Sequence, residues 1–355
     1  MTRWSSLGRW QAIGILALAG CFMRLLLAVA ATVPVSPENI SSSGDGDLAL
    51  FRRIVAEMQG GASYYAAAHH QLVTSGYGTQ SVFNWRLPGL AFILSVLPSL
   101  DIGQWILIAI AVLAGNIMVW VLNQQGGSRL AALGALVMLL SLAGAFMPGT
   151  VLLSELVAGI FVLLSVAFYG SGFRRAGLAA GAVALFAREF AGVYILVCIW
   201  LAWRAQRWRE LSAWAAVLLV YGAYFLWHYG QVQLHVTAAD RGYAEDWIQF
   251  GGLSFVLATS AFNGFFALLP TPAHAVLLPV ALLGLLAWPG ETGVRASLTV
   301  LAVIIVFAVV GKPFNTYWGL IYTPLLSLGL AWAPWAIADL MRGALGRRRT
   351  EPQIG

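Results

Sequence analysis

Residues 41–47 read Ser-Ser-Ser-Gly-Asp-Gly-Asp and open the only long polar interval of this chain. The interval closes at residues 84–88, which read Asn-Trp-Arg-Leu-Pro. Apolar runs long enough to cross a bilayer lie before and after it. It brings carboxylates, tyrosines and arginines together directly after the first apolar run. We therefore expect the chemistry of this protein to lie in this first loop.

The composition is that of a membrane protein with many spans. Of 355 residues, 60% are hydrophobic and only 10% are charged, whereas soluble domains carry about 25% charged residues. The net charge of +6 comes from arginine clusters at the ends of apolar runs, such as 174–175 and 347–349. This placement follows the positive-inside rule and argues against nucleic-acid binding. We predict an all-α polytopic protein with one transmembrane domain over residues 1–355.

The arginine clusters also predict the topology. The candidate spans are 11–33, 103–123, 129–147, 151–170, 176–187, 190–203, 211–229, 275–288, 296–310 and 316–339. Two further apolar stretches, 87–100 and 251–269, are interrupted by proline or glycine. If these two lie at the outer face without crossing, all arginine clusters fall inside. The prediction is about ten crossings in the plasma (inner) membrane, with both termini cytoplasmic.

This topology places several polar segments on one side of the membrane. The first outer loop covers residues 34–86 and the second covers 230–252, while the basic tail 340–355 lies inside. Within the first loop, apolar residues at a spacing of three to four predict a surface helix from about Asp47 to Gln59. Asp47 is the expected N-cap and Gly60-Gly61 the expected stop.

Two carboxylates precede this helix. Asp45 and Asp47 lie where the chain leaves the first span, at the boundary between water and lipid. A carboxylate that is partly desolvated there is suited to act as a general base. The alternative interpretation is a turn residue and a helix cap.

Five further charged residues are candidates. Glu155 lies at the outer end of an apolar run, and the pair Arg188-Glu189 interrupts another. Ionisable groups inside a membrane indicate a functional site, although they also serve as structural ion pairs. Lys312, the only lysine, and Arg86 each precede a helix start. Either residue is placed to bind a phosphate group, and the alternative interpretation is that it anchors the chain at the membrane interface.

The sequence lacks the motifs of several enzyme classes. It contains no Walker loop, no GxSxG and no HExxH, so ATP hydrolysis and serine or metallohydrolase chemistry have no support. His69 and His70 have no partner at the spacing of metal ligands. We expect no metal site and no cofactor.

The order of these residues resembles that of the GT-C-fold glycosyltransferases, which include protein O-mannosyltransferases and lipid A aminoarabinose transferases. The family has an acidic residue after the first span, then an aromatic residue, a glycine and a tyrosine, and later a basic residue before a proline. Here the matching residues, in chain order, are Asp47, Phe51, Gly60 or Gly61, Tyr64 or Tyr65, Arg86 and Pro88. Ser154-Glu155 resembles a later acidic step. Lys312, Tyr317, Tyr322 and Pro324 resemble the basic residue and tyrosines before a late helix.

The resemblance implies a sugar transferase at the periplasmic face. The donor would be a polyprenyl-phosphate sugar, the acceptor a hydroxyl of a lipid, glycan or protein, and the outcome inversion. Asp47, aided by Asp45, would act as base, and Lys312, Arg86 and Arg188 would bind the phosphate. The substrate would also contact Glu155, Glu189, Tyr64, Tyr65, Asn315 and Tyr317. Some family members need a divalent cation; with only two clustered aspartates, we expect none here.

A secondary transporter is the main alternative. It would use Glu155, Arg188 and Glu189 as its intramembrane ion or substrate groups. Transporters usually contain inverted repeats and short loops, whereas this chain has no evident repeat and a first loop of about fifty residues. A non-catalytic scaffold would leave the placement of the charges unexplained. We therefore favour the transferase.

Overall fold

The computed structural model describes residues 2–32, 46–242, 249–261, 263–311 and 315–346. Within these ranges the protein is built of fourteen α-helices and seven short 3₁₀ turns, without a strand. The predicted all-α class is confirmed.

Six helical segments are long and apolar enough to cross a membrane. They are α1 (Arg9–Ala30), α5 (Leu100–Gly126), α6 (Ser128–Ser141) together with the 3₁₀ turn that follows it, α10 (Trp208–His235), α13 (Gly290–Val309) and α14 (Thr323–Ala344). Shorter helices complete the bundle, namely α7 (Ser154–Gly170), α8 (Arg174–Ala187), α9 (Gly192–Arg204) and α12 (Thr271–Ala287). These helices are compatible with a membrane protein, and the total of about ten crossings stays a prediction.

Two apolar helices are too short to cross. α4 (Pro88–Val96) has 9 residues and α11 (Gly252–Ala261) has 10. At about 1.5 Å per residue each spans roughly 15 Å, which is half of a hydrocarbon core of about 30 Å. Their lengths agree with the expectation that 87–100 and 251–269 do not cross.

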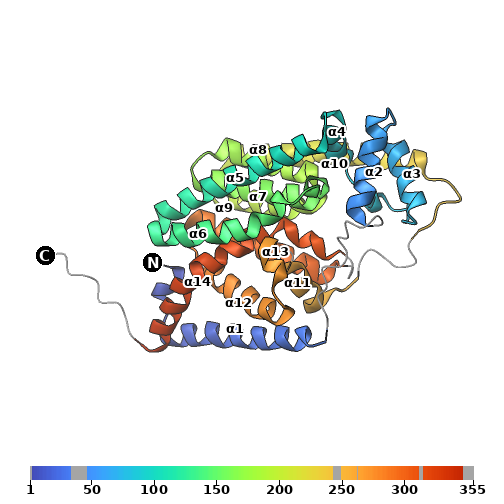
Figure 1. Cartoon of the computed structure of the whole chain (residues 1–355). Coiled ribbons are helices and arrows are strands. Elements are labelled where there is room, and N and C mark those ends of the chain that lie inside the picture. The colour runs from blue at the N-terminus through green and yellow to red at the C-terminus, as the bar shows by residue number, and fades with distance from the viewer. Residues whose placement is uncertain (1, 33–45, 243–248, 262, 312–314, 347–355) are drawn as a thin grey trace.

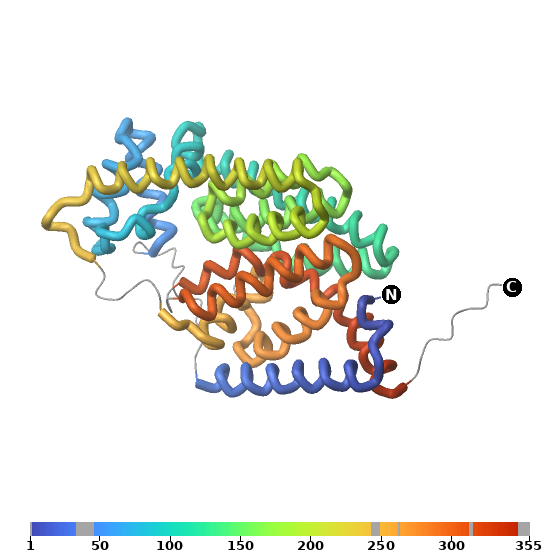
Figure 2. The backbone as a smooth tube through the Cα atoms, turned by 180° about the vertical axis from the view of Figure 1, so that it is seen from behind, coloured from blue at the N-terminus to red at the C-terminus, as the bar shows by residue number. Residues whose placement is uncertain are grey.

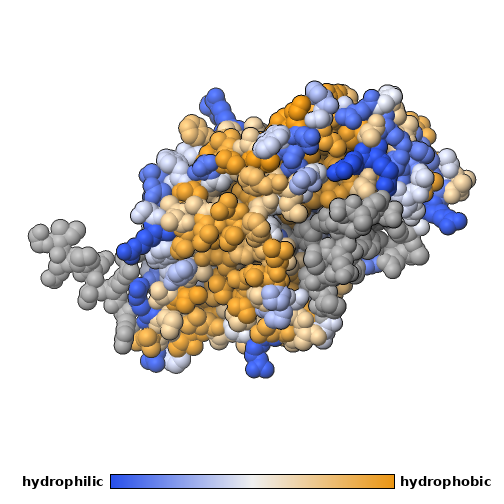
Figure 3. Space-filling view, viewed as in Figure 1, coloured by the Kyte–Doolittle hydropathy of each residue, from blue (hydrophilic) through white to orange (hydrophobic). Residues whose placement is uncertain are grey.

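The bundle has two distinct ends. Figures 1 and 2 show the two termini at one end of the long helices, and α2 (Asp47–Gln59) and α3 (Tyr64–Thr74) at the opposite end. In Figure 3 apolar side chains cover the middle of the visible face, and hydrophilic ones gather towards both ends. The first outer loop therefore forms a helical cap on one end of an apolar bundle.

Helix α2 begins at Asp47 and ends at Gln59, as predicted. The predicted cap is wrong in one respect: Gly46 is the N-cap, and Asp47 is the first helical residue. Its carboxylate is therefore free to bond outside the helix. On one side of α2, Phe51 and Val55 pack on the main core; on the other, Ile54 packs against α3.

Glycines set the closest helix contacts of the core. A Cβ on Gly284 of α12 would lie 1.9 Å from Gly329 O of α14, so only glycine permits this approach. A Cβ on Gly159 of α7 would lie 2.0 Å from Leu320 O of the 3₁₀ turn η7 (Thr316–Ile321). Through Gly159, η7 packs directly on α7 close to the turn that carries Glu155.

Several predicted boundaries differ from the structure, among them two near the C-terminus. The span expected from residue 316 begins as η7, and the α-helix starts only at Thr323. The tail expected from residue 340 begins later, because α14 continues to Ala344. Leu340 is fully buried against the first helices, and its burial keeps this part of the chain helical.

Candidate active site

Asp47 lies in the first turn of α2 and accepts two hydrogen bonds from tyrosines. Tyr77 Oη donates to Asp47 Oδ1 over 2.6 Å, and Tyr317 Oη donates to Asp47 Oδ2 over 2.6 Å. Tyr77 belongs to the same outer loop, whereas Tyr317 lies on η7. The carboxylate thus joins the loop to a distant part of the bundle, and its position at a helix N-terminus favours its negative charge.

Arg86 is the second member of the site. It precedes α4 and points inward, where Nη2 donates to Tyr317 Oη over 2.7 Å and Nη1 contacts Glu155 Oε1 at 2.6 Å. Its guanidinium lies 5.1 Å from the centre of the Phe51 ring, and Tyr64 Oη donates to its backbone carbonyl. Burial works to lower the pKa of Arg86, but nearby Glu155 and Tyr317 outweigh it and raise this pKa. The side chain is therefore charged.

Glu155, Arg188 and Glu189 extend the site into the bundle. Glu155 is fully buried in the first turn of α7. Arg188 follows α8 and places Nε 3.0 Å from Glu155 Oε1 and Nη1 2.8 Å from Glu189 Oε1. The Arg188 guanidinium also lies 5.1 Å from the centre of the Phe190 ring. Arg188 and Glu189 lie in the connection between α8 and α9.

These contacts form one continuous chain, Asp47–Tyr317–Arg86–Glu155–Arg188–Glu189. Six of the predicted residues meet here, although they come from five separate parts of the sequence. Three carboxylates face two guanidinium groups, so these groups carry a formal charge of −1 together. Both arginines contact the same Glu155 oxygen, and an anionic ligand would have to share or take over these contacts.

The other predicted substrate residues surround this chain. Asn315 Oδ1 lies 3.5 Å from Tyr317 Oη, and Asn315 Nδ2 is buried without a hydrogen-bond partner among the described residues. A buried donor without an acceptor is costly, so Asn315 is suited to bind a substrate oxygen. Tyr65 packs behind the site, where its hydroxyl lies 2.9 Å from His228 Nδ1. Its contact with substrate stays a prediction.

Two predicted residues, Asp45 and Lys312, lie outside the described residues. Among those described, no group of three His, Cys, Asp or Glu side chains is placed to hold a metal ion. The histidines of α3 instead pair with carboxylates. His69 Nε2 lies 3.0 Å from Asp240 Oδ2, and His70 Nδ1 lies 2.7 Å from Glu57 Oε1.

Sequence reasoning did not identify Tyr77 or the pairing of Asp240 with His69. Tyr77 lies between two glycines, and a tyrosine in such a turn was a usable signal. The pairing had no such signal, because Asp240 and His69 are 171 residues apart. Together with the bond from Thr79 N to Arg241 O, this pair fixes the second outer loop to the first.

An apolar cavity lies against Arg86. Its volume is about 30 Å³, which is room for one or two water molecules. Its lining is mostly apolar and comes from α2, α3, α4 and the start of α7: Phe51, Ile54, Val55, Tyr64, Arg86, Leu87, Leu90, Ala91, Leu94, Leu152 and Ser154. Arg86 therefore borders an apolar cavity beneath α2 and α3.

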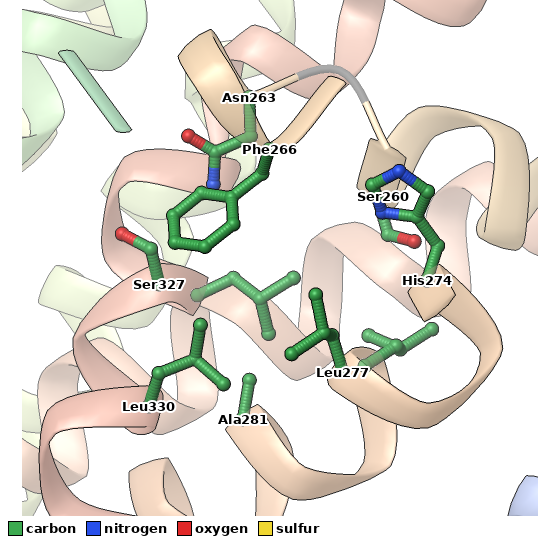
Figure 4. A pocket seen from close by; sticks show the side chains of 10 residues that line it. Ser260, Asn263, Phe266, His274, Leu277, Ala281, Ser327 and Leu330 are labelled. Atoms are coloured by element: carbon green, nitrogen blue, oxygen red, sulfur yellow. The ribbon is translucent and has the colours of Figure 1, made fainter. Parts of the chain in front are cut away.

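A second cavity of about 30 Å³ lies elsewhere, between α11, α12 and α14. Figure 4 shows Asn263 and Ser327 on one side of it and His274 with Ser260 on the other. Asn263 is bonded to Ser141 Oγ and to the carbonyl of Thr323. The described residues of its lining include no carboxylate, so this cavity suits ordered water better than the predicted chemistry.

Comparison of this chain with protein-family models, with curated proteins and with solved structures gives no match. The functional interpretation therefore depends on the geometry of the site.

Proposed function

We propose that this protein is a membrane glycosyltransferase that moves a sugar from a polyprenyl-phosphate donor to a hydroxyl acceptor. The observation that carries the proposal is the link Asp47–Tyr317–Arg86, in which a carboxylate and a guanidinium share one tyrosine hydroxyl. A sugar transfer of this kind needs an anionic base on one side of the anomeric carbon and a cation at the departing phosphate on the other.

The proposed step is a single displacement. The acceptor hydroxyl gives its proton to Asp47 while its oxygen forms a bond to the anomeric carbon. The bond from that carbon to the phosphate oxygen breaks, and the electron pair leaves with the polyprenyl phosphate. Arg86 stabilises the negative charge that develops there. Attack opposite the leaving group inverts the configuration.

The surroundings of Arg86 support a lipid-linked donor. The apolar cavity next to its guanidinium is bordered by α4, whose outer residues Phe92, Ile93 and Val96 are 61%, 57% and 65% exposed. At about 30 Å³ the cavity is too small for an isoprene unit. We therefore propose that α4 moves outward when the donor enters, so that the first isoprene lies beside Leu90 and Leu94.

Glu155 and Asn315 would complete the binding site. Glu155 keeps Arg86 and Arg188 close together while no phosphate is bound. Asn315 Nδ2, which has no hydrogen-bond partner in the part of the chain that the structure describes, would donate to a sugar hydroxyl or a phosphate oxygen. The same proposal includes the location of the site at the periplasmic face, a sugar as the transferred group and a hydroxyl group as the acceptor.

A transporter is the second candidate, since buried ion pairs such as Glu155–Arg188 also serve transport. One experiment separates the two. Purified protein is given radiolabelled polyprenyl-phosphate sugars, and release of polyprenyl phosphate is compared for wild type, Asp47→Asn and the control Asp101→Asn, an exposed carboxylate on α5. We expect release by wild type and the control, and a loss of about 10²–10⁴-fold in Asp47→Asn. Equal release by all three would remove Asp47 from the mechanism. If folded wild type releases none, flux in liposomes becomes the next assay.

A further inference from the structure

An open groove lies on the surface of the bundle at the end opposite the candidate active site. It has a volume of about 340 Å³ and runs between α5 and α7. Its lining is Asn116, Ile117, Trp120, Phe168, Ser171 and Phe173. Trp120 is 50% exposed and Phe173 is 66% exposed. None of these residues belongs to the network around Asp47, so the groove is a separate feature.

The groove is apolar along its length. The two polar groups in its wall are already satisfied by their own helices: Asn116 Nδ2 donates to Val112 O, and Ser171 Oγ donates to Phe168 O. The wall is thus suited to hydrocarbon rather than to a polar solute.

The groove lies in the half of α5 that is farther from the candidate active site. Its lining on α5 runs from Asn116 to Trp120, which is four residue steps or about 6 Å at 1.5 Å per residue. It therefore fits a segment of one acyl chain within a leaflet whose hydrocarbon part is about 15 Å thick.

Positive charge lies beside the groove, next to Phe173. Arg174 and Arg175 follow Phe173 directly and form the first turn of α8. Both are exposed, and neither has an ion-pair partner among the described residues. The N-terminus of α8 adds partial positive charge at the same place. An anion next to a hydrocarbon chain fits this arrangement.

We propose that this groove binds an anionic phospholipid of the leaflet opposite the active site. Its acyl chain lies along Ile117, Trp120 and Phe168, and its phosphodiester headgroup contacts Arg174 and Arg175. This inference does not depend on the proposed transferase activity. The lipid would hold the end of α7 and the start of α8 against α5. The opposite end of α7 carries Glu155, and the opposite end of α8 leads to Arg188.

The test is native mass spectrometry of the full-length protein with phosphatidylglycerol or phosphatidylcholine of identical chains. Wild type is compared with Arg174→Gln/Arg175→Gln, with Trp120→Ala, and with the control Arg204→Gln/Arg209→Gln, two exposed arginines of the neighbouring helices α9 and α10. Size-exclusion chromatography verifies that each variant is folded.

We expect wild type and the control to retain at least one phosphatidylglycerol in preference to phosphatidylcholine. The Arg174/Arg175 variant should bind it roughly 30-fold more weakly, since each basic residue near an anionic surface contributes about 1 kcal/mol. Trp120→Ala should weaken both lipids. Equal binding of the two lipids by wild type would overturn the proposal. Unchanged phosphatidylglycerol binding by the Arg174/Arg175 variant would also overturn it. A cross-link that joins position 120 of two copies of the chain would overturn it as well, because a second copy would then occupy the groove.

Discussion

The hydroxyl of Tyr317 donates to Asp47 Oδ2 over 2.6 Å, although the two residues are 270 positions apart. The same hydroxyl accepts a hydrogen bond from Arg86 Nη2. One side chain from η7 therefore fixes the distance between the proposed base and the proposed phosphate-binding cation. A displacement at an anomeric carbon needs this distance to be fixed, because base and leaving group act on opposite sides of one atom.

Tyr317→Phe should separate this role from that of Tyr77. Loss of the Tyr317 hydroxyl leaves Arg86 Nη2 without its acceptor and removes one donor from Asp47. Hydrogen bonds to charged groups contribute about 1.5–3 kcal/mol, so we expect a loss of roughly 10–100-fold in both kcat and donor affinity. Tyr77→Phe removes the other tyrosine donor to Asp47 but leaves the bond between Arg86 and Tyr317 in place, so its donor KM should stay near that of wild type. Equal KM values for the two variants would contradict the link through Tyr317.

Arg86→Lys should not be a conservative change. A lysine carries the charge but has no planar fork to reach Tyr317 and Glu155 at once. We expect the donor KM to rise by about tenfold or more, with acceptor KM unchanged, in steady-state assays of sugar transfer. Arg53→Lys is the matched control, because Arg53 bonds to Gln71 and Ser75 on the other side of α2. A normal donor KM in Arg86→Lys would place the phosphate elsewhere.

Glu155→Gln should make the protein depend on its ligand for stability. Two buried guanidinium groups lie 2.6 Å and 3.0 Å from one Glu155 oxygen, and removal of one partner from a buried ion pair costs about 3–5 kcal/mol. The melting temperature should fall, and polyprenyl phosphate should raise it by more than it does in wild type. Glu291→Gln, whose carboxylate is 67% exposed, should change stability by at most about 1 kcal/mol. Identical ligand shifts in wild type and Glu155→Gln would exclude a phosphate at these arginines.

Asp240 should hold the two outer loops together over a defined pH range. Burial raises the pKa of Asp240, but the hydrogen bond from Thr237 N and the contact with His69 outweigh it, so the pKa is lowered. A lowered pKa means that the stabilisation is present above the ordinary value of about 3.9 and is lost as the pH falls through the lower value of the docked loop.

Hydrogen exchange at Thr79, whose N–H bonds to Arg241 O, reports this docking. Corrected for intrinsic rates, protection should not fall between pH 8 and pH 5. It should fall several-fold in Asp240→Asn and not in the control Glu57→Gln, whose carboxylate contacts His70 instead. Loss of protection in wild type already between pH 7 and pH 5 would show that Asp240 does not control the docking.

The candidate site residues could be selected from the sequence, whereas the packing around them could not. Asp47, Arg86 and Glu155 are rare charges in an apolar chain, so each was visible against its background. Their mutual arrangement was not visible, because it depends on contacts between residues as distant as Arg86 and Tyr317, 231 positions apart. No local periodicity encodes such a contact.

Arg295 shows the same limit. It lies directly before the predicted span 296–310, yet it is 1% exposed within α13. Its guanidinium lies 3.7 Å from the centre of the Tyr169 ring and bonds to Cys198 Sγ. An arginine near a predicted span end is usually an exposed topology signal. Only the tertiary structure shows that this one is packed inside, because α13 begins at Gly290 rather than at residue 296.

Gly159→Ala should damage the site without touching any of its polar groups. The new Cβ would lie 2.0 Å from Leu320 O, so η7 must move away from α7. Overpacking of this kind costs about 1–3 kcal/mol, and the movement carries Tyr317 away from Asp47 and Arg86.

We expect Gly159→Ala to lower kcat for sugar transfer by at least tenfold and to reduce thermal stability. Gly222→Ala in α10 is the matched control: nothing lies within 4 Å of its Cβ position, and alanine in a helix interior is favoured over glycine by about 0.5–1 kcal/mol. That variant should be as stable as wild type or more so, with full activity. If Gly159→Ala were equally active, the close contact between α7 and η7 would not be what positions Tyr317.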